Sequence, residues 1–254
     1  MNEVFKLLNS ESIVVSEQLA QGVYYVNHIH KNDNIFYPMF FNLSMGLERL
    51  FKLIIVTNRI ITNKKDQETI KSFDHNLLKL KKQVDDIAKN YDIPSLDIET
   101  PIHISIIDAL SGFSEKDRYY NFDKIDKIAS KNPISFFEKH VISNIKKKLA
   151  PKLKLSENEC VIGKILNKYA ISTTYENLKS YIKHEKEWSH IEKYLRLYIL
   201  QIIKQYALIL IKLSQNALTK KINTIPYYNE IFGHMIQDDT WYKTHKTYSL
   251  FNLR

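Results

Sequence analysis

The chain of 254 residues carries a formal net charge of +9 at pH 7 and is 44% hydrophobic and 26% charged, which excludes a wholly disordered protein. Its five glycines and six prolines are too few for the tight turns of an all-β sandwich or a doubly wound α/β fold. None of the glycines lies in a G-x-G or G-K-[ST] motif, so a glycine-rich phosphate loop is excluded as well.

Helical periodicity predicts an all-α protein. In the first part of the chain, apolar residues recur three and four positions apart, as on the buried face of a helix. Pro38 fits the start of the first of these helices, where its missing N–H costs little. We expect helices at about residues 40–55, 73–87 and 103–113, with a short loop between Pro94 and Pro101.

The second part repeats this pattern after a break near residues 130–133. Pro133 begins a helix that Pro151 ends, and Pro226 opens a short final helix. Between them we expect helices at about residues 157–169, 174–187 and 189–217. We therefore predict two parts, residues 20–130 and residues 131–254, with the second packed on the first as one globular unit.

No feature predicts a membrane or secretory protein. The most apolar stretch, residues 195–213, is interrupted by Arg196 and Lys204, so we interpret it as a buried helix. The N-terminal residues lack the basic and apolar regions of a signal peptide. Cys160 is the only cysteine, which excludes an intrachain disulfide and is typical of a reducing compartment. We expect a cytoplasmic protein.

Three short stretches occur in the order typical of one known family. They are LERLFKL at residues 47–53, HNLLKL at residues 75–80 and RYY at residues 118–120. This order resembles the HEPN superfamily of bacterial and archaeal helical domains, in which an amphipathic helix with a Glu-Lys pattern precedes an H-[DN]-L-x-x-L segment and an Arg-Tyr segment. The resemblance covers about residues 20–130 and implies an up-down helical bundle.

Many HEPN domains are dimeric, metal-independent ribonucleases that use an Arg-x4–6-His motif. No histidine follows any arginine of this sequence at that spacing. The resemblance therefore implies a protein of phage defence or of a toxin–antitoxin system that binds RNA or a nucleotide without the usual catalytic motif. It also implies a homodimer or a partner protein, with no cofactor and no metal.

The first group of candidate ligand-binding residues lies in the first two motifs. Glu48 and Lys52 are four apart in the favourable order for an ion pair, either on a solvated helix surface or in a groove. His75 follows Asp74 and precedes Asn76, and Lys79 lies one turn later. His75 is either a structural hydrogen-bond donor at a helix start or a general acid or base, because imidazole changes charge near neutral pH.

The second group lies in the Arg-Tyr segment and comprises Arg118, Tyr119, Asn121 and Asp123. A guanidinium binds phosphate or carboxylate through two hydrogen bonds, a tyrosine stacks on bases, and an asparagine recognises a base edge. The alternative is an interhelical corner in which Arg118 pairs with a buried acid, for which Glu48 is the obvious partner. In the binding hypothesis, the two groups face each other across one groove.

A third group is a run of lysines suited to a phosphate backbone or, equally, to a solvated face. It comprises Lys139, Lys146, Lys147, Lys148, Lys152 and Lys154. His234, Asp238, Asp239 and His245 match no metal-binding spacing, and we predict no metal site.

Two alternative functions stay open. The chain is either a divergent metal-independent endoribonuclease, in which His75 and Arg118 meet, or a non-catalytic module for protein interaction and dimerisation. Whether it is an enzyme is therefore open, and the sequence favours binding.

Overall fold

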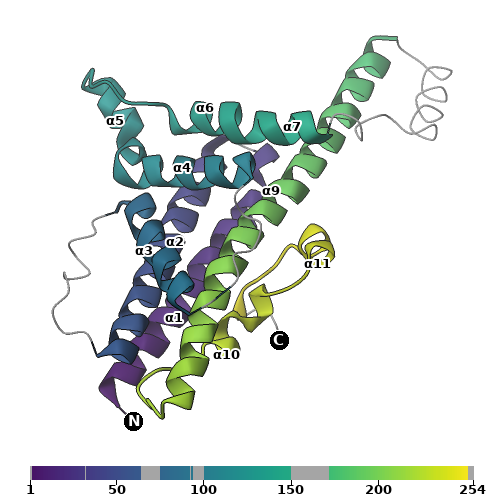
Figure 1. Cartoon of the computed structure of the whole chain (residues 1–254). Helices are drawn as coiled ribbons and strands as arrows, with labels where there is room; N and C mark the ends of the chain where they lie inside the picture. The colour runs from purple at the N-terminus through teal and green to yellow at the C-terminus, as the bar shows by residue number, and fades with distance from the viewer. Residues whose placement is uncertain are drawn as a thin grey trace.

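The computed structural model describes residues 2–31, 33–63, 75–91, 93, 100–149 and 172–250. In the helix that begins at residue 172, side chains are described from residue 185 onward. Every regular element in these ranges is helical, and they contain no β-strand (Figure 1). The prediction of an all-α protein is confirmed.

Three long helices lie side by side and form the body of the molecule (Figure 1). They are α1 (Glu3–Val26), α2 (Phe36–Thr62) and α9 (Ser172–Thr219), and the shorter α3 (Leu77–Asn90) packs against α2. The short 3₁₀ turns η1 (Ile29–Lys31) and η2 (Asp33–Ile35) connect α1 to α2. This arrangement follows from apolar faces that are too wide to be covered by one neighbour each.

Helix α1 was not predicted, although its buried face follows helical spacing at Leu8, Val15, Leu19 and Val23. The apolar periodicity of this segment is weak, because the same face also buries the polar or small residues Ser12, Ser16 and Gly22. These small residues allow α1 and α2 to pack closely. A Cβ at Gly22 would lie 2.6 Å from Leu43 Cδ2 of α2, and one at Gly46 would lie 2.7 Å from Leu19 Cδ2 of α1.

A crossbar of shorter helices lies across one end of the long helices (Figure 1). It consists of α4 (Pro101–Glu115) and of a second rod made of α6 (Pro133–Phe137), the π-helical turn η5 (Glu138–Ile142) and α7 (Ser143–Leu149). The 3₁₀ turn η4 (Asp117–Tyr119) and α5 (Tyr120–Ile125) connect the two rods at one end. Pro133 begins α6 as predicted, and the Asn132 side chain accepts hydrogen bonds from Ile134 N and Ser135 N.

The two helices predicted at residues 174–187 and 189–217 are one continuous helix, α9. No proline or glycine lies between them to end the first helix. Among the described residues, the segment Glu185–Thr219 is the one helix long and apolar enough to cross a membrane, with mean hydropathy 1.4, but 78% of its most apolar window is buried in the protein. This burial is typical of the core helix of a globular protein.

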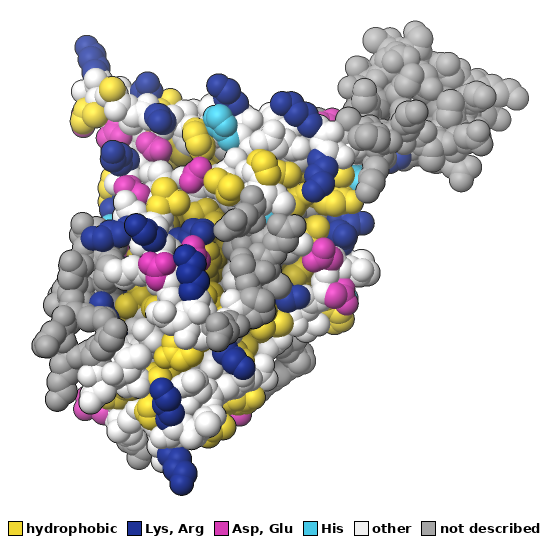
Figure 2. All heavy atoms as spheres, viewed as in Figure 1, with side chains coloured by type: hydrophobic (Ala, Val, Ile, Leu, Met, Phe, Trp, Pro, Cys, Tyr) yellow, Lys and Arg dark blue, Asp and Glu magenta, His cyan; other side chains and the backbone are white. Residues whose placement is uncertain are grey.

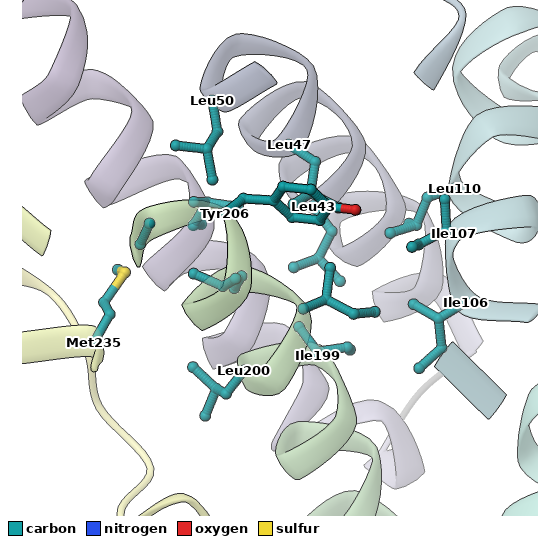
Figure 3. Packing of buried hydrophobic residues seen from close by; sticks show 14 of the residues in the cluster. Leu43, Leu47, Leu50, Ile106, Ile107, Leu110, Ile199, Leu200, Tyr206 and Met235 are labelled. Atoms are coloured by element: carbon teal, nitrogen blue, oxygen red, sulfur yellow. The ribbon is translucent and has the colours of Figure 1, made fainter. Parts of the chain in front are cut away.

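One hydrophobic core includes residues from both predicted parts of the chain. Figure 3 shows side chains from α2, α4 and α9 meeting in this core, so the core crosses the boundary near residue 130 without interruption. The labelled residues are Leu43, Leu47, Leu50, Ile106, Ile107, Leu110, Ile199, Leu200, Tyr206 and Met235.

The C-terminal segment folds back against α9 as α10 (Asn229–Phe232), the 3₁₀ turn η7 (Gly233–Met235) and α11 (Asp239–Thr244). Buried Arg196 of α9 holds it by donating to the carbonyl oxygens of Tyr242 at 2.7 Å and Lys243 at 2.8 Å, and to Asn27 Oδ1. The helix predicted after Pro226 thus begins three residues later and is short.

Candidate functional site

The side chain of Glu48 is a buried carboxylate that joins two helices. It lies on α2 and is 4% exposed. Its Oε1 accepts a hydrogen bond from Lys52 Nζ, one turn along the same helix, at 2.6 Å. Its Oε2 lies 3.0 Å from Nδ1 of His75, which immediately precedes Asn76 and helix α3. Both oxygens are therefore partnered, as a carboxylate removed from water requires.

His75 is held from two sides. Asn76 is the N-cap of α3, and its side-chain oxygen accepts from Lys79 N at 2.7 Å. This hydrogen bond fixes the backbone next to His75, which directly precedes the N-cap. Ser114 Oγ of α4 donates to the His75 carbonyl oxygen at 2.8 Å. The imidazole remains 44% exposed. When Nδ1 donates to Glu48, Nε2 carries the lone pair of the ring, which is the arrangement of an oriented base.

Five of the candidate residues thus lie together: Glu48, Lys52, His75, Asn76 and Lys79. Arg118 does not join them in the expected way, because Glu48 bonds to Lys52 and His75 and no contact between Arg118 and either Glu48 or His75 occurs within the described part of the chain. His75 takes the place expected for Arg118, because its imidazole lies against Glu48 Oε2.

The Arg-Tyr segment forms an exposed corner after α4. The guanidinium carbon of Arg118 lies 5.1 Å from the centre of the Tyr119 ring, and Tyr119 is 55% exposed. Such a pair offers a positive charge and an aromatic face to solvent together. Asn121 is exposed on α5, and Asp123 points to the groove described next.

An open groove of about 900 Å³ lies between α4 and the η4–α5 corner, and Asp123 is the one predicted candidate that lines it. Burial raises the pKa of the Asp108 carboxyl, and it also raises the pKa of Asp117 against the opposing effect of Lys131. Sequence reasoning missed this groove, because no local motif joins its walls. The lining residues are Leu78, Asp108, Ser111, Gly112, Glu115, Lys116, Asp117, Asp123, Lys124, Ile128, Ala129, Ser130 and Lys131.

The predicted lysine patch lies on the second rod of the crossbar, and part of it has protein partners. Lys146 forms an ion pair with Glu187 at 2.8 Å, and Lys148 donates to the Tyr198 hydroxyl at 2.8 Å. Lys139 and Lys147 are exposed. Figure 2 shows basic side chains on this face interspersed with acidic ones rather than gathered into one field. Lys152 and Lys154 lie outside the described residues.

Among the described residues, no group of three or more histidine, cysteine, aspartate or glutamate side chains has the geometry to hold a metal ion. Of the C-terminal set noted in the sequence, His234 instead hydrogen-bonds through Nε2 to the Tyr248 carbonyl oxygen at 2.7 Å. Asp238 caps α11 by accepting from Trp241 N at 2.8 Å. These side chains therefore have structural roles.

No protein-family model matches the chain, and neither the curated proteins nor the solved structures contain a significant match to it. The two features of the molecule that suggest a site are the buried Glu48 with its partners Lys52 and His75, and the neighbouring groove.

Proposed function

We propose that this chain is a HEPN-like cytoplasmic protein that binds RNA or a nucleotide in a bacterial phage-defence or toxin–antitoxin system. One observation supports the proposal: residues of the first two motif stretches meet at His75, beside the helix that leads into the third. Glu48 comes from the first stretch, His75 from the second, and Ser114 from the segment that leads into the third. Convergence of distant motifs at a half-exposed imidazole is typical of a binding or catalytic site.

Phosphate is the part of the ligand that this site suits best. Lys52 is 20% exposed beside Glu48, and Lys79 lies one turn into α3 from His75. Arg118 and Tyr119 extend the cationic and aromatic surface at the end of α4. A guanidinium binds phosphate oxygens through two hydrogen bonds, and an exposed tyrosine stacks on unpaired bases.

The proposal is tested with Arg118→Ala and a labelled single-stranded RNA, by fluorescence anisotropy at several salt concentrations. Loss of one phosphate contact lowers the slope of log K against log salt by about 0.7 and weakens binding several-fold. Arg49→Ala is the matched control, because Arg49 lies elsewhere on α2 in an ion pair with Glu11 at 3.0 Å. RNA binding of correctly folded Arg118→Ala that equals wild type would remove the site.

Wild-type protein that binds neither RNA nor nucleotides would overturn the function itself. That result would favour the interaction module, which predicts no salt-dependent affinity for nucleic acid despite the positive charge. Analytical ultracentrifugation then tests for a homodimer.

The Glu48–His75 contact favours a second candidate function, metal-independent RNA cleavage. With Nδ1 bonded to Glu48, His75 Nε2 is able to take the proton of a ribose 2′-hydroxyl. The 2′-oxygen then attacks the adjacent phosphorus, the bond to the 5′-oxygen breaks, and the leaving oxygen takes up a proton. A nearby cation such as Lys52 stabilises the charge that develops on the phosphate.

Cleavage is measured on a labelled RNA in the presence of EDTA. His75→Ala is expected to abolish it, and His28→Ala is the matched control because His28 Nδ1 bonds to the Tyr24 carbonyl oxygen at the end of α1. RNA left intact by the wild-type protein, or cut equally by His75→Ala, would exclude this candidate.

A further inference from the structure

The groove beside His75 is lined by both polar and apolar side chains. On one side lies α4 with Asp108, Ser111 and Gly112, and on the other lies the segment after α5 with Ile128 and Ala129. Its volume of about 900 Å³ falls in the range of small-molecule sites. Leu78 of α3 also lines it, so the groove begins within one turn of the α3 start at which His75 is held.

The acidic side chains of the groove are not equivalent. Glu115 accepts from Ser111 Oγ at 2.8 Å, and Asp117 interacts with the backbone and charge of Lys131. Asp108 makes neither a hydrogen bond nor an ion pair within the described part of the chain, and desolvation alone raises its pKa. Asp108 is exposed at the groove, so its carboxylate is accessible to a ligand that supplies hydrogen-bond donors.

Cations lie at the rim of the same groove. Lys116, Lys124 and Lys131 line it and are exposed. The ammonium group of Lys124 lies 5.4 Å from the centre of the Tyr120 ring. The lining of the groove therefore combines an exposed carboxylate without a protein partner among the described residues, apolar side chains and positive charge. A ligand that fits this pattern carries donors on a flat ring and a negative charge at some distance from them.

Among the four common RNA bases, guanine alone presents two adjacent donors, N1–H and the N2 amino group, on its Watson–Crick edge. A single carboxylate accepts both of them. Adenine and cytosine would each set a ring nitrogen lone pair against the carboxylate, and uracil flanks its one donor with two carbonyl oxygens. Recognition of unpaired bases through this edge is the usual route to sequence preference in RNA.

We propose that this groove binds a guanine base, with Asp108 accepting from its Watson–Crick edge and the rim lysines contacting phosphate. The proposal rests on the RNA or nucleotide binding proposed above and gives it a base preference. Asp108 sets the preference for guanine, whereas Lys116, Lys124 and Lys131 contribute to the affinity for any nucleotide.

The test uses five-nucleotide labelled RNAs that differ only in the central base, which is guanine, inosine, adenine, cytosine or uracil. Their dissociation constants are measured by fluorescence anisotropy at one salt concentration. One carboxylate bonded to two donors is expected to favour guanine by about tenfold over adenine, cytosine and uracil. Inosine lacks the N2 amino group and is expected to bind with intermediate affinity.

Asp108→Asn is expected to reduce the preference to less than about twofold while the other RNAs bind as before, because one of the two acceptor oxygens becomes a donor. The matched control is Asp86→Asn on α3, where Asp86 forms an exposed ion pair with Lys89 at 3.5 Å. Circular dichroism verifies the fold of both variants, and the inosine comparison needs no variant at all.

Each result decides between the two proposals. Equal affinity for all five RNAs, or an unchanged guanine preference in folded Asp108→Asn, would overturn the guanine site and leave RNA binding intact. If neither the RNAs nor guanosine 5′-monophosphate, titrated by thermal shift, bind to the wild-type protein, both proposals are wrong.

Discussion

Replacing Gly46 with alanine is expected to destabilise the protein, although alanine is the better helix former. The added Cβ would lie 2.7 Å from Cδ2 and 2.9 Å from Cγ of Leu19, and 3.3 Å from the Leu19 backbone nitrogen. Non-bonded carbons normally stay about 3.5–4.0 Å apart. Leu19 is completely buried, so it cannot turn toward solvent. Overpacking of this kind costs about 1–3 kcal/mol.

Gly112 provides the comparison that isolates this cost. It also lies inside a helix, but a Cβ there would approach only the carboxylate oxygen of Asp117, at 3.3 Å. Both Gly46→Ala and Gly112→Ala gain helix propensity, by up to about 1 kcal/mol in a helix interior, so this gain largely cancels in the comparison. We therefore expect Gly46→Ala to be less stable than Gly112→Ala by about 1–3 kcal/mol.

The free energy of unfolding is measured by urea denaturation, followed by circular dichroism at 222 nm, with the slopes of the transitions compared as well. Gly22→Ala should match Gly46→Ala, because its Cβ would lie 2.6 Å from Leu43 Cδ2 on the opposite helix. If Gly46→Ala proved as stable as Gly112→Ala, α1 and α2 would not pack as closely as described, and the reasoning would be refuted.

Three further predictions follow from buried polar groups. Glu48→Gln removes the negative charge that pairs with Lys52, so urea denaturation should show a loss of about 1–3 kcal/mol, and a Glu48→Met, Lys52→Met double variant should recover part of it. Arg196→Met leaves the carbonyl oxygens of Tyr242 and Lys243 in α11 without their donor, so trypsin should cleave this segment faster. An unchanged cleavage rate would show that Arg196 does not hold α11 in place. Burial raises the pKa of Tyr228 to about 12 from 10, so its contribution to stability is complete below pH 10 and is lost as the pH rises toward 12. Absorbance at 295 nm measures this ionisation, and Tyr228→Phe should remove one late-titrating phenol.

The sequence predicted helices in which long runs of apolar residues recur at helical spacing. The helix predicted at residues 103–113 is α4, Pro101–Glu115, and the one at residues 40–55 is the middle of α2. It missed α1, where Ser12 and Gly22 share the buried face with apolar residues. Periodicity measures the apolar content of a face, whereas close packing of two helices depends on small residues that lower that content.

In the candidate site, local contacts were predictable from the sequence and tertiary contacts were not. The Glu48–Lys52 pair was predictable because helix geometry fixes the distance between residues four apart. The contact of His75 with Glu48 is tertiary, and the sequence suggested Arg118 as the partner instead. The groove was invisible to sequence reasoning because Asp108 and Lys131 are brought together only by the turn of the chain through η4 and α5.

The positive charge of the chain is not by itself the reason to expect RNA binding. In the predicted patch, Glu187 offsets the charge of Lys146, whereas Lys148 donates to the neutral Tyr198 hydroxyl and keeps its charge. The cations near His75 lie on α2, where Lys52 pairs with Glu48, on α3 and on the segments around α5. Cations held on separate elements around a carboxylate and apolar walls select a ligand by its shape and hydrogen bonds, whereas a continuous basic face attracts any polyanion. The proposed function therefore rests on the arrangement around His75 and the groove rather than on net charge.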